Sequence, residues 1–392
     1  LANGAVIENG ALTAGQDGSG GELIVHGRGR IGANITDNGG APVDVTIAAG
    51  ASTAEVVLVG TNTYTGMTFI NDGNLYAQTA DAVPDGADMR ITGGEFRIGF
   101  VATESKHLGT VRIAGGGAFT QQFTGRRGQG IFSFDQFLLE DGELVPGQLV
   151  GEGSIVKRTV GSANINADAR STYSGQVVVE EGRLLVGGLP QASFLVRGGE
   201  LHLPVGDNSI ELAGGDLLVT NELGGDIHVT ADSRIATEIF FGLDAGITGT
   251  ITGDADLILS SQPTFFDDQR RLTITGESPD FSGQVSIDSV RVLINNEQAL
   301  GTGPIAIFPA GVLHLAPGGA NFEDAQLDLP NNVHLRGGEL RGTNSVFRPQ
   351  LLLGDLFVSD HSLISTVHMV GDTHLADGSL LTAYGRDEVQ LQ

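Results

Sequence analysis

The feature that most restricts the possible folds of this chain is a run of turn, strand, turn and strand that recurs along it. The three copies occupy residues 60–77, 172–186 and 280–294. Each copy has one aromatic residue in its first turn, and these aromatic residues, Tyr64, Tyr173 and Phe281, are almost equally spaced along the chain. A period this even indicates structural units that stack on one another instead of separate domains.

Glycine occupies two positions of the repeat. The first position follows the aromatic residue by two and belongs to the first turn. It is filled by Gly66, Gly175 and Gly283. The second position lies between the two strands, where glycine favours a tight turn. Here the first copy has Gly73 and the second has Gly182, whereas the third has Ser289, so its second turn departs most from the pattern.

The composition agrees with a fold made of many short strands. The chain has 60 glycines in 392 residues, about twice the usual share. They follow no Gly-X-Y period, which excludes collagen, and 40% hydrophobic residues is too many for a disordered glycine-rich tract. Short alternating segments such as 176–179 and 200–203 indicate strands, and no segment has the period of an amphipathic helix. We therefore predict an all-β fold with glycine at the turns.

The repeated run resembles the passenger-associated repeat of bacterial autotransporter proteins. Residues 151–157, Gly-Glu-Gly-Ser-Ile-Val-Lys, resemble the G-x-G-x-L-x-K lead-in of that family, and residues 253–257 are a weaker copy without the second glycine and the lysine. The best-matched segments cover about a third of the chain. The resemblance implies a right-handed parallel β-helix that is exported to the bacterial cell surface. It implies little about activity, because such passengers include adhesins, toxins and enzymes.

The repeat also predicts the size of the solenoid. With roughly 20 residues per rung and about 4.8 Å between rungs, the chain would form about 18–20 rungs. We expect one solenoid over residues 1–392. Its internal periods are about 1–60 in part, 61–172, 173–280 and 281–392.

The charge of the chain restricts its partners. The formal net charge is −26, with 47 acidic residues and only two lysines, Lys106 and Lys157. A basic surface for nucleic acid is absent, and repulsion opposes binding to nucleic acid or to anionic membranes. We expect no cofactor, although a divalent cation such as calcium is compatible with so acidic a surface. The alternative is a solvated acidic exterior that keeps a long β structure soluble.

Cysteine is absent, which rules out disulfides, cysteine-bound metals and thiol catalysis. No stretch approaches the roughly 20 apolar residues of a membrane-spanning helix, so we expect no membrane insertion by this segment. Residues 1–4 do not resemble a signal peptide, and residues 387–392 do not resemble the last strand of an outer-membrane barrel. We therefore expect a segment of a longer protein, with the outer-membrane translocator absent from this chain.

Two irregular segments are candidate binding loops. In residues 119–137, five phenylalanines surround Arg126 and Arg127, and a protruding loop on a rigid scaffold is a usual place for binding. The alternative is a longer turn whose phenylalanines fill the interior. The second segment interrupts the next period at a similar place. Its candidate residues are Phe265, Phe266, Asp267, Asp268, Arg270 and Arg271.

Pairs of titratable residues, most of them acidic, are the candidates for chemistry, because parallel β-helices also include polysaccharide lyases and hydrolases. The pairs are Asp254 with Asp256, Asp267 with Asp268, and Asp372 with His374. Residues two apart in a strand project on one face, as a pair of catalytic carboxylates requires. However, aspartate is also common in turns because it hydrogen-bonds the local backbone. No lysine lies near any pair, and Arg270 with Arg271 is the nearest basic group to one.

Four histidines lie between apolar residues in strand-like segments, so their side chains should point outward. They are His202, His228, His314 and His334. A stacked ladder of them could bind metal or respond to mild acid. Their separation in the sequence favours isolated surface histidines instead.

These observations lead to one main hypothesis and two alternatives. The chain is predicted to be a non-enzymatic, extracellular β-helix, either an adhesive or structural passenger or a segment of a surface fibre. Its partner would be a cell-surface or matrix component, or copies of itself. The alternatives are a filament subunit that stacks end to end and a carbohydrate-active enzyme.

Overall fold

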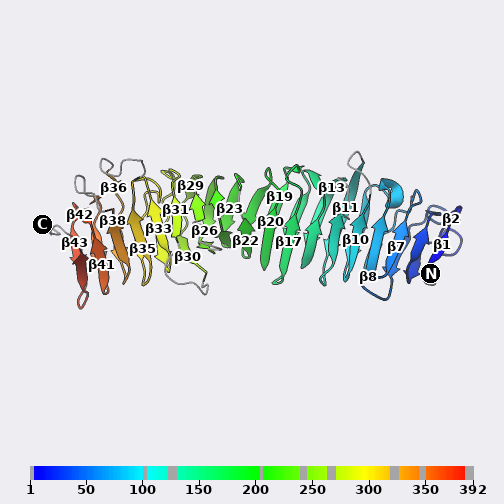
Figure 1. The fold of residues 1–392 in the computed structure, drawn as a ribbon, viewed down its shortest axis with the longest axis horizontal. Coiled ribbons are helices and arrows are strands. Elements are labelled where there is room, and N and C mark those ends of the chain that lie inside the picture. The colour runs from blue at the N-terminus through cyan, green and yellow to red at the C-terminus, as the bar shows by residue number, and fades with distance from the viewer. Residues whose placement is uncertain are drawn as a thin grey trace. The chain divides into compact units, whose positions relative to one another are not determined.

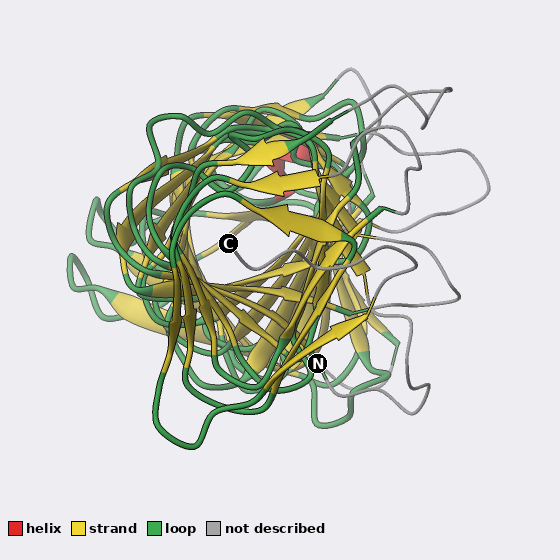
Figure 2. Ribbon diagram, turned by 90° about the vertical axis from the view of Figure 1, so that its left-hand side faces the viewer, coloured by secondary structure: helices red, strands yellow, loops and turns green. Residues whose placement is uncertain are grey.

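The computed structural model describes residues 4–99, 104–121, 130–203, 206–238, 245–262, 271–317, 326–343 and 350–384. The chain divides into two compact units, Leu1–Ser193 and Phe194–Gln392, and each is described by itself. Nearly all regular structure is β-strand, and the described residues contain one short helical turn, η1 (Ala80–Ala82), seen in Figure 2. In the described part of the chain, no helix is long and apolar enough to cross a bilayer.

Parallel strands stack as a β-solenoid of about 15 turns, which confirms the predicted all-β fold and parallel β-helix. The solenoid has fewer turns than predicted, because several turns are longer than the assumed rung. Gly29 pairs with Val56, for example, and Ile258 pairs with Ser286. The loops between strands, whose length the repeat does not fix, account for the difference.

The first unit contains two long parallel ladders (Figure 1). Its strands are β1 (Ala5–Ile7), β2 (Ala11–Leu12), β3 (Gly21–His26), β4 (Gly29–Ile31), β5 (Asn34–Ile35), β6 (Val43–Ala48), β7 (Glu55–Leu58), β8 (Thr68–Ala77), β9 (Ala87–Ile91), β10 (Gly94–Ile98), β11 (Ser105–Ile113), β12 (Ala118–Gln121), β13 (Ile131–Leu139), β14 (Gly142–Val145), β15 (Gln148–Gly151), β16 (Ser154–Lys157), β17 (Ser162–Asn166), β18 (Thr172–Tyr173), β19 (Gln176–Val179) and β20 (Arg183–Gly187). One ladder joins β3, β6, β8, β9, β11, β13, β16 and β19. The other joins β1, β4, β7, β8, β10, β12, β14, β17 and β20.

The second unit is built in the same way. Its strands are β21 (Ser193–Val196), β22 (Glu200–Leu203), β23 (Ile210–Ala213), β24 (Asp216–Val219), β25 (Glu222–Leu223), β26 (Ile227–Ala231), β27 (Ser233–Thr237), β28 (Ala245–Ile247), β29 (Ile251–Gly253), β30 (Leu257–Ser261), β31 (Arg271–Ile274), β32 (Val285–Asp288), β33 (Arg291–Ile294), β34 (Ile305–Ile307), β35 (Val312–Leu315), β36 (Asp328–Leu329), β37 (Val333–Leu335), β38 (Glu339–Gly342), β39 (Gln350–Leu352), β40 (Leu356–Val358), β41 (Ser362–Ser365), β42 (Val367–Met369), β43 (Thr373–Leu375) and β44 (Leu381–Tyr384). One ladder joins β22, β24, β27, β30, β32, β34, β37, β40 and β43. Another joins β25, β28, β31, β33, β35, β38, β41 and β44.

The interior of each unit is made of columns of side chains, because alternate residues of every strand point inward and successive strands are in register. One column in the first unit shows the pattern and its single exception. It consists of Val25, Ile47, Ile70, Ile91, Ile113, Leu139, Lys157 and Val179. The residue that breaks the aliphatic column is Lys157, which has no exposed surface.

The first glycine of the repeat is required by a close backbone contact. A Cβ atom on Gly66, Gly175 or Gly283 would lie 2.4, 2.2 or 1.9 Å from a carbonyl oxygen of the preceding turn of the solenoid. Any side chain at these positions would collide with the backbone of that turn. The motif therefore marks places where two turns of the solenoid approach closely.

The second glycine of the repeat is required by backbone conformation as well as by close contact, since a Cβ on Gly182 would lie 2.1 Å from the Thr159 carbonyl oxygen. Gly73 and Gly182 have φ angles of +75° and +72°, in the left-handed region that disfavours other residues. Ser289, which replaces glycine in the third copy, has a φ angle of +57°. The third copy therefore keeps the same left-handed turn despite its different residue.

The aromatic residue of each copy lies in the interior. Tyr64 and Phe281 are 1% exposed and Tyr173 is fully buried. The Tyr64 hydroxyl hydrogen-bonds the Thr68 hydroxyl at 2.8 Å, and the Tyr173 hydroxyl donates to the Gln176 carbonyl at 3.2 Å. Each buried hydroxyl thus has a partner, as a polar group in a core requires.

We expect the protein to lose stability as the pH rises from 10 to 12. Burial raises the pKa of Tyr64 from 10.0 to about 12. Since the folded chain holds this phenolic proton more tightly than the unfolded chain, the stabilisation is complete below pH 10 and is lost as the pH passes 12. The expected contribution is about 2–3 kcal/mol. Urea unfolding across this pH range measures it, and an equal alkaline loss in Tyr64→Phe would contradict the assignment.

Candidate functional site

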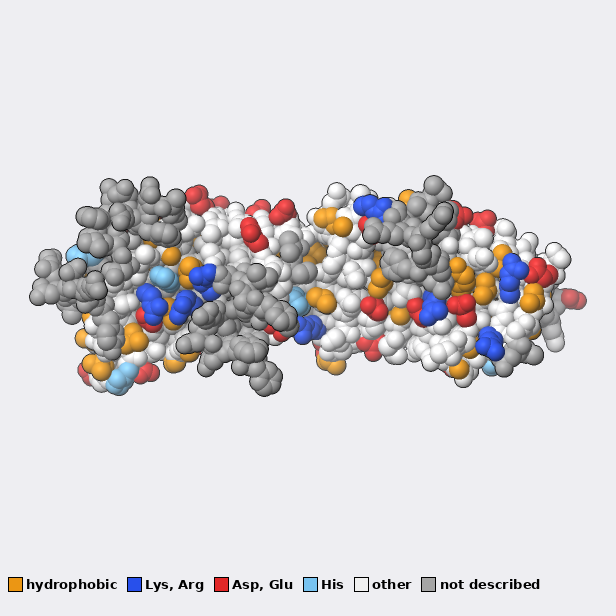
Figure 3. Space-filling view, in the orientation of Figure 1, with side chains coloured by type: hydrophobic (Ala, Val, Ile, Leu, Met, Phe, Trp, Pro, Cys, Tyr) orange, Lys and Arg blue, Asp and Glu red, His pale blue; other side chains and the backbone are white. Residues whose placement is uncertain are grey.

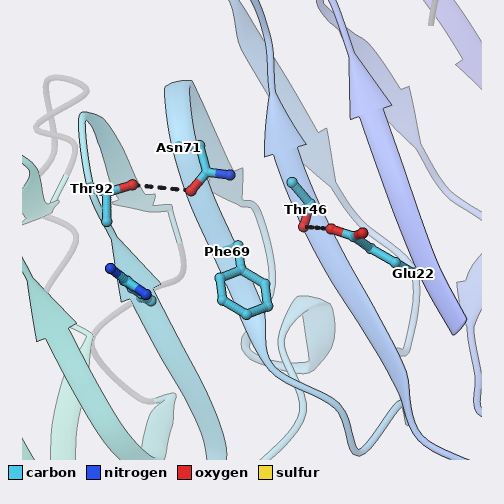
Figure 4. Close-up of a pocket in the computed structure, with 6 residues that line it drawn as sticks. Glu22, Thr46, Phe69, Asn71 and Thr92 are labelled. Atoms are coloured by element: carbon cyan, nitrogen blue, oxygen red, sulfur yellow. Dashed lines mark hydrogen bonds between the residues drawn. The ribbon is translucent and has the colours of Figure 1, made fainter. Parts of the chain in front are cut away.

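An open hollow of about 360 Å³ lies on the outer face of the first unit, across four consecutive strands of one ladder (Figure 4). It is lined by Glu22 of β3, Thr46 of β6, Phe69 and Asn71 of β8, Arg90 of β9 and Thr92 just beyond β9. Thr46 pairs with Phe69, and Phe69 pairs with Arg90. Strand register therefore gathers residues from distant parts of the sequence into one row.

Two polar pairs flank an aromatic ring in this hollow. The Thr46 hydroxyl donates to the Glu22 carboxylate, and the Thr92 hydroxyl donates to the Asn71 side-chain oxygen at 3.0 Å. The Phe69 ring lies between these two pairs (Figure 4). An aromatic surface beside a few oriented polar groups is suited to a polar ligand such as a sugar. Only one lining residue is a carboxylate, whereas glycoside hydrolysis uses two.

The predicted binding loops are only partly described. Arg126, Arg127, Phe265, Phe266, Asp267, Asp268 and Arg270 lie outside the described residues. Arg271 is described and is the first residue of β31, where it pairs with Arg291 of β33. Arg271 is thus an outward residue of a regular strand. The hollow around Phe69 was not predicted, because its lining depends on pairing between strands.

The phenylalanines around the first predicted loop fill the interior of the first unit, as the alternative prediction stated. Phe119, Phe132, Phe134 and Phe137 are 1–5% exposed. Their rings meet edge to face, with centroids 5.5 Å apart for Phe119 and Phe132 and 5.3 Å apart for Phe134 and Phe137. Phe123 lies outside the described residues. The described phenylalanines therefore belong to the core and do not form an exposed aromatic base.

One aspartate of a predicted acidic pair, Asp256, has a structural role. Asp256 donates its backbone N–H to Asp232 Oδ1 at 3.1 Å, and its own Oδ1 accepts from Gln284 N at 3.0 Å. Asp44 accepts from Met67 N in the same way, at 2.8 Å. Such carboxylates link one turn of the solenoid to the next. The prediction had aspartate bonding the local backbone of its own turn, whereas these bonds reach a neighbouring turn.

Residues 53–77 match the family model described as the passenger-associated-transport-repeat. The chain carries a passenger-associated transport repeat. The matched segment includes Tyr64, Gly66 and Gly73 of the first copy, and it supplies Phe69 and Asn71 of the hollow. No curated protein and no solved structure matches the chain.

The passenger-associated repeat and the β-solenoid together fit an autotransporter passenger. The repeat implies a secreted or surface protein. The same repeat suggests a passenger without catalytic activity.

The four histidines that lie between apolar residues, at positions 202, 228, 314 and 334, point outward as predicted. They do not pair with one another. His202 pairs with Leu218, and the His228 Nδ1 lies 3.0 Å from the Thr252 hydroxyl. His334, however, is not isolated. Its ring stacks on Phe357 at 4.6 Å, and Phe357 stacks on His374 at 4.7 Å. The expectation of isolated histidines is therefore wrong for His334.

One end of this stack adjoins two carboxylates. Asp355, Asp372 and His374 each present a ligand atom within 4.8 Å of the others. The Asp355 carboxylate also accepts from Asp372 N at 3.0 Å, so it already links two turns. One imidazole with two carboxylates suits Zn²⁺ or Mn²⁺ better than Ca²⁺, which takes oxygen ligands. The sequence had suggested calcium, and a bound divalent cation stays a prediction.

We expect Zn²⁺ to bind this cluster more tightly than Ca²⁺, because the imidazole nitrogen of His374 is a ligand for Zn²⁺, whereas Ca²⁺ takes oxygen ligands. Replacement His374→Gln should weaken Zn²⁺ binding by about tenfold or more. The exposed His368 of β42 lies outside the cluster, so His368→Gln is the matched control. Isothermal titration of the whole chain measures both affinities. Equal affinities for the two variants would contradict a site at Asp355, Asp372 and His374.

Proposed function

We propose that this chain is a non-enzymatic, extracellular β-helix passenger that acts by adhesive contact of its outer faces with a cell-surface or matrix component. The observation that carries the proposal is the open hollow around Phe69, which lies on the outer face and includes residues of the passenger-associated repeat. A shallow site with an aromatic ring and mixed polar groups is suited to contact and release of a polar surface ligand.

The chemistry of the described acidic groups supports a role without catalysis. The hollow offers a single carboxylate, Glu22, which already accepts the Thr46 hydroxyl. Asp256 and Asp355 accept backbone N–H groups of the following turns. A carboxylate that holds the scaffold together is poorly placed to exchange protons with a substrate.

Adhesion can be tested with the purified chain on arrays of glycans and matrix proteins and on whole cells. The variants Phe69→Ala and Arg90→Gln should reduce retention. Arg158→Gln should leave it unchanged, since Arg158 lies 3.5 Å from Glu180 and away from the hollow. Circular dichroism of each variant confirms the fold.

The same preparation separates the two other candidate functions. Release of reducing ends from a panel of polysaccharides would support a carbohydrate-active enzyme. Long uniform threads in electron micrographs without added partner would support a filament subunit. If all variants were retained equally, the hollow would not be the adhesive surface.

A further inference from the structure

Basic side chains gather on one outer face of the second unit, although the chain carries a formal charge of −26. The face spans β31, β33, β35 and β38, which pair consecutively and in parallel. In each strand the first and third residues are half-buried and the second and fourth are buried, so the first and third point outward. The charged or titratable residues at these outward positions, here named the arginine strip, are Arg271, Arg291, His314, Glu339 and Arg341.

Strand register brings these side chains together. Arg271 lies opposite Arg291, and His314 lies opposite Arg341, with about 4.8 Å between neighbouring strands. The space-filling view shows basic side chains beside a histidine over these strands (Figure 3). Like charges directly opposite one another destabilise a sheet unless an anion offsets them.

Arg341 and Arg291 differ in how their charge is offset. The Arg341 guanidinium donates two hydrogen bonds to the Glu339 carboxylate, at 2.8 and 2.9 Å. No hydrogen bond or ion pair to the Arg291 guanidinium is found in the described part of the chain. Burial, followed by the charges of Arg341 and Arg291, lowers the pKa of His314, which is consistent with a locally positive potential.

We propose that the arginine strip binds a carboxylate-bearing polysaccharide. A guanidinium presents a planar fork of donors that matches a carboxylate in a bidentate arrangement. Arg271 and Arg291 lie on neighbouring strands and Arg341 lies two strands further on, which suits an extended chain that carries several acidic groups. This inference concerns the second unit and does not depend on the hollow around Phe69.

A polycarboxylate fits the strip better than nucleic acid does. Double-stranded DNA carries one negative charge per about 1.7 Å, which a few arginines cannot neutralise beside so acidic a protein. At physiological salt, charges more than about 8 Å away are largely screened. The strip can therefore attract a moderately charged polymer in spite of the net charge of the whole chain.

The test uses the full chain and polygalacturonate as the probe, in the presence of EDTA. We expect binding of polygalacturonate, a fall in affinity with added salt, and no binding of the fully methyl-esterified polymer. The double variant Arg271→Gln with Arg291→Gln should lose about tenfold or more in affinity. Arg28→Gln changes the net charge by one unit at an exposed turn of the first unit and should bind as the parent does.

Several results would overturn the proposal. The first is that polygalacturonate does not bind at low salt, and the second is that its methyl ester binds with the same affinity. The third is that Arg28→Gln loses as much affinity per replaced arginine as the double variant does. Tighter binding of a DNA duplex would assign the strip to nucleic acid instead. The variant Arg291→Lys keeps the charge without the fork, and it should fall between the parent chain and Arg291→Gln.

A pH series gives a second readout, independent of the arginine variants. His314 faces Arg271, Arg291, Arg341 and Glu339, and a bound carboxylate would favour its protonated form. Affinity should therefore rise as the pH falls into the range in which His314 takes up a proton, which its lowered pKa places on the acidic side of the ordinary histidine range. The ligand carboxylates remain ionised down to about pH 4. His314→Gln should remove that rise. If the affinity of His314→Gln rose by the same amount at low pH, His314 would not be part of the binding site.

Discussion

Replacement of Gly283 by alanine is expected to lower the free energy of unfolding by at least about 3 kcal/mol. The added Cβ would lie 1.9 Å from the Ala255 carbonyl oxygen and 3.1 Å from the Phe281 ring. Neither neighbour can move away easily. The Ala255 oxygen belongs to the backbone of the preceding turn, and the Phe281 ring is buried. Relief of the collision would separate two turns of the solenoid and weaken the pairing of β30 with β32.

Gly246 provides the matched control for this substitution. It lies in β28, and a Cβ there would have its nearest neighbours at 3.8 Å, which is ordinary contact. Gly246→Ala should therefore be neutral, or stabilising by about 0.4–1 kcal/mol through the unfolded chain. Urea unfolding followed by circular dichroism measures both variants. Similar stabilities for the two variants would show that the close approach at Gly283 does not constrain the fold.

The second large effect is expected at Lys157, the charged residue inside an aliphatic column. Its ammonium group donates to the Glu181 carbonyl and the Thr159 hydroxyl, each at 3.3 Å, and to the Thr159 carbonyl. Lys157→Met keeps the length of the side chain but leaves these oxygens without their donor. We expect a loss of about 1–3 kcal/mol, the cost of buried acceptors that lose their partner.

Lys106 is the control for Lys157. Its Nζ lies 3.5 Å from the carboxylate of Asp85, whose side chain is 74% exposed. An ion pair with so exposed a partner contributes about 0–1 kcal/mol, so Lys106→Met should cost less than Lys157→Met. Thermal unfolding ranks the two variants, and the reverse order would contradict the role given to the Lys157 ammonium group.

The third copy of the repeat shows how the same turn forms without a lysine. Leu259 pairs with Ile287 in the interior, as Lys157 pairs with Val179 in the second copy. The carbonyl of Ser289 then accepts the hydroxyl of Ser261 instead of an ammonium group. The missing lysine that weakened the sequence match is therefore replaced by a shorter donor from the neighbouring turn.

The repeat predicted the fold well because each of its characteristic residues is needed at its own position in the structure. Gly66, Gly175 and Gly283 mark close approaches between turns, and the aromatic residues mark the core. The number of turns could not be predicted as reliably, because loop length varies without changing the strands. Pairs such as Gly29 with Val56 are further apart in the sequence than the assumed rung allows.

The candidate surfaces were less predictable because they depend on register between distant strands. Arg271 was expected in a loop, and nothing in the sequence near it indicated that Arg291 and His314 would lie on neighbouring strands. The rings of His334, Phe357 and His374 stack although the three residues are unevenly spaced in the sequence. Such unequal spacings follow from loop length, so a fixed period could not have found them.

The bonding between turns also determines how each unit would respond to mechanical tension. Val45 and Thr46 of β6, for example, pair with β8 of the next turn, and hydrogen bonds of this kind hold the turns in series. A pull on the chain ends of one unit would load the outermost turn first and peel it away before the next. Each release would free roughly 80 Å of extended chain, so the unit would yield in many small steps and act as an extensible tether.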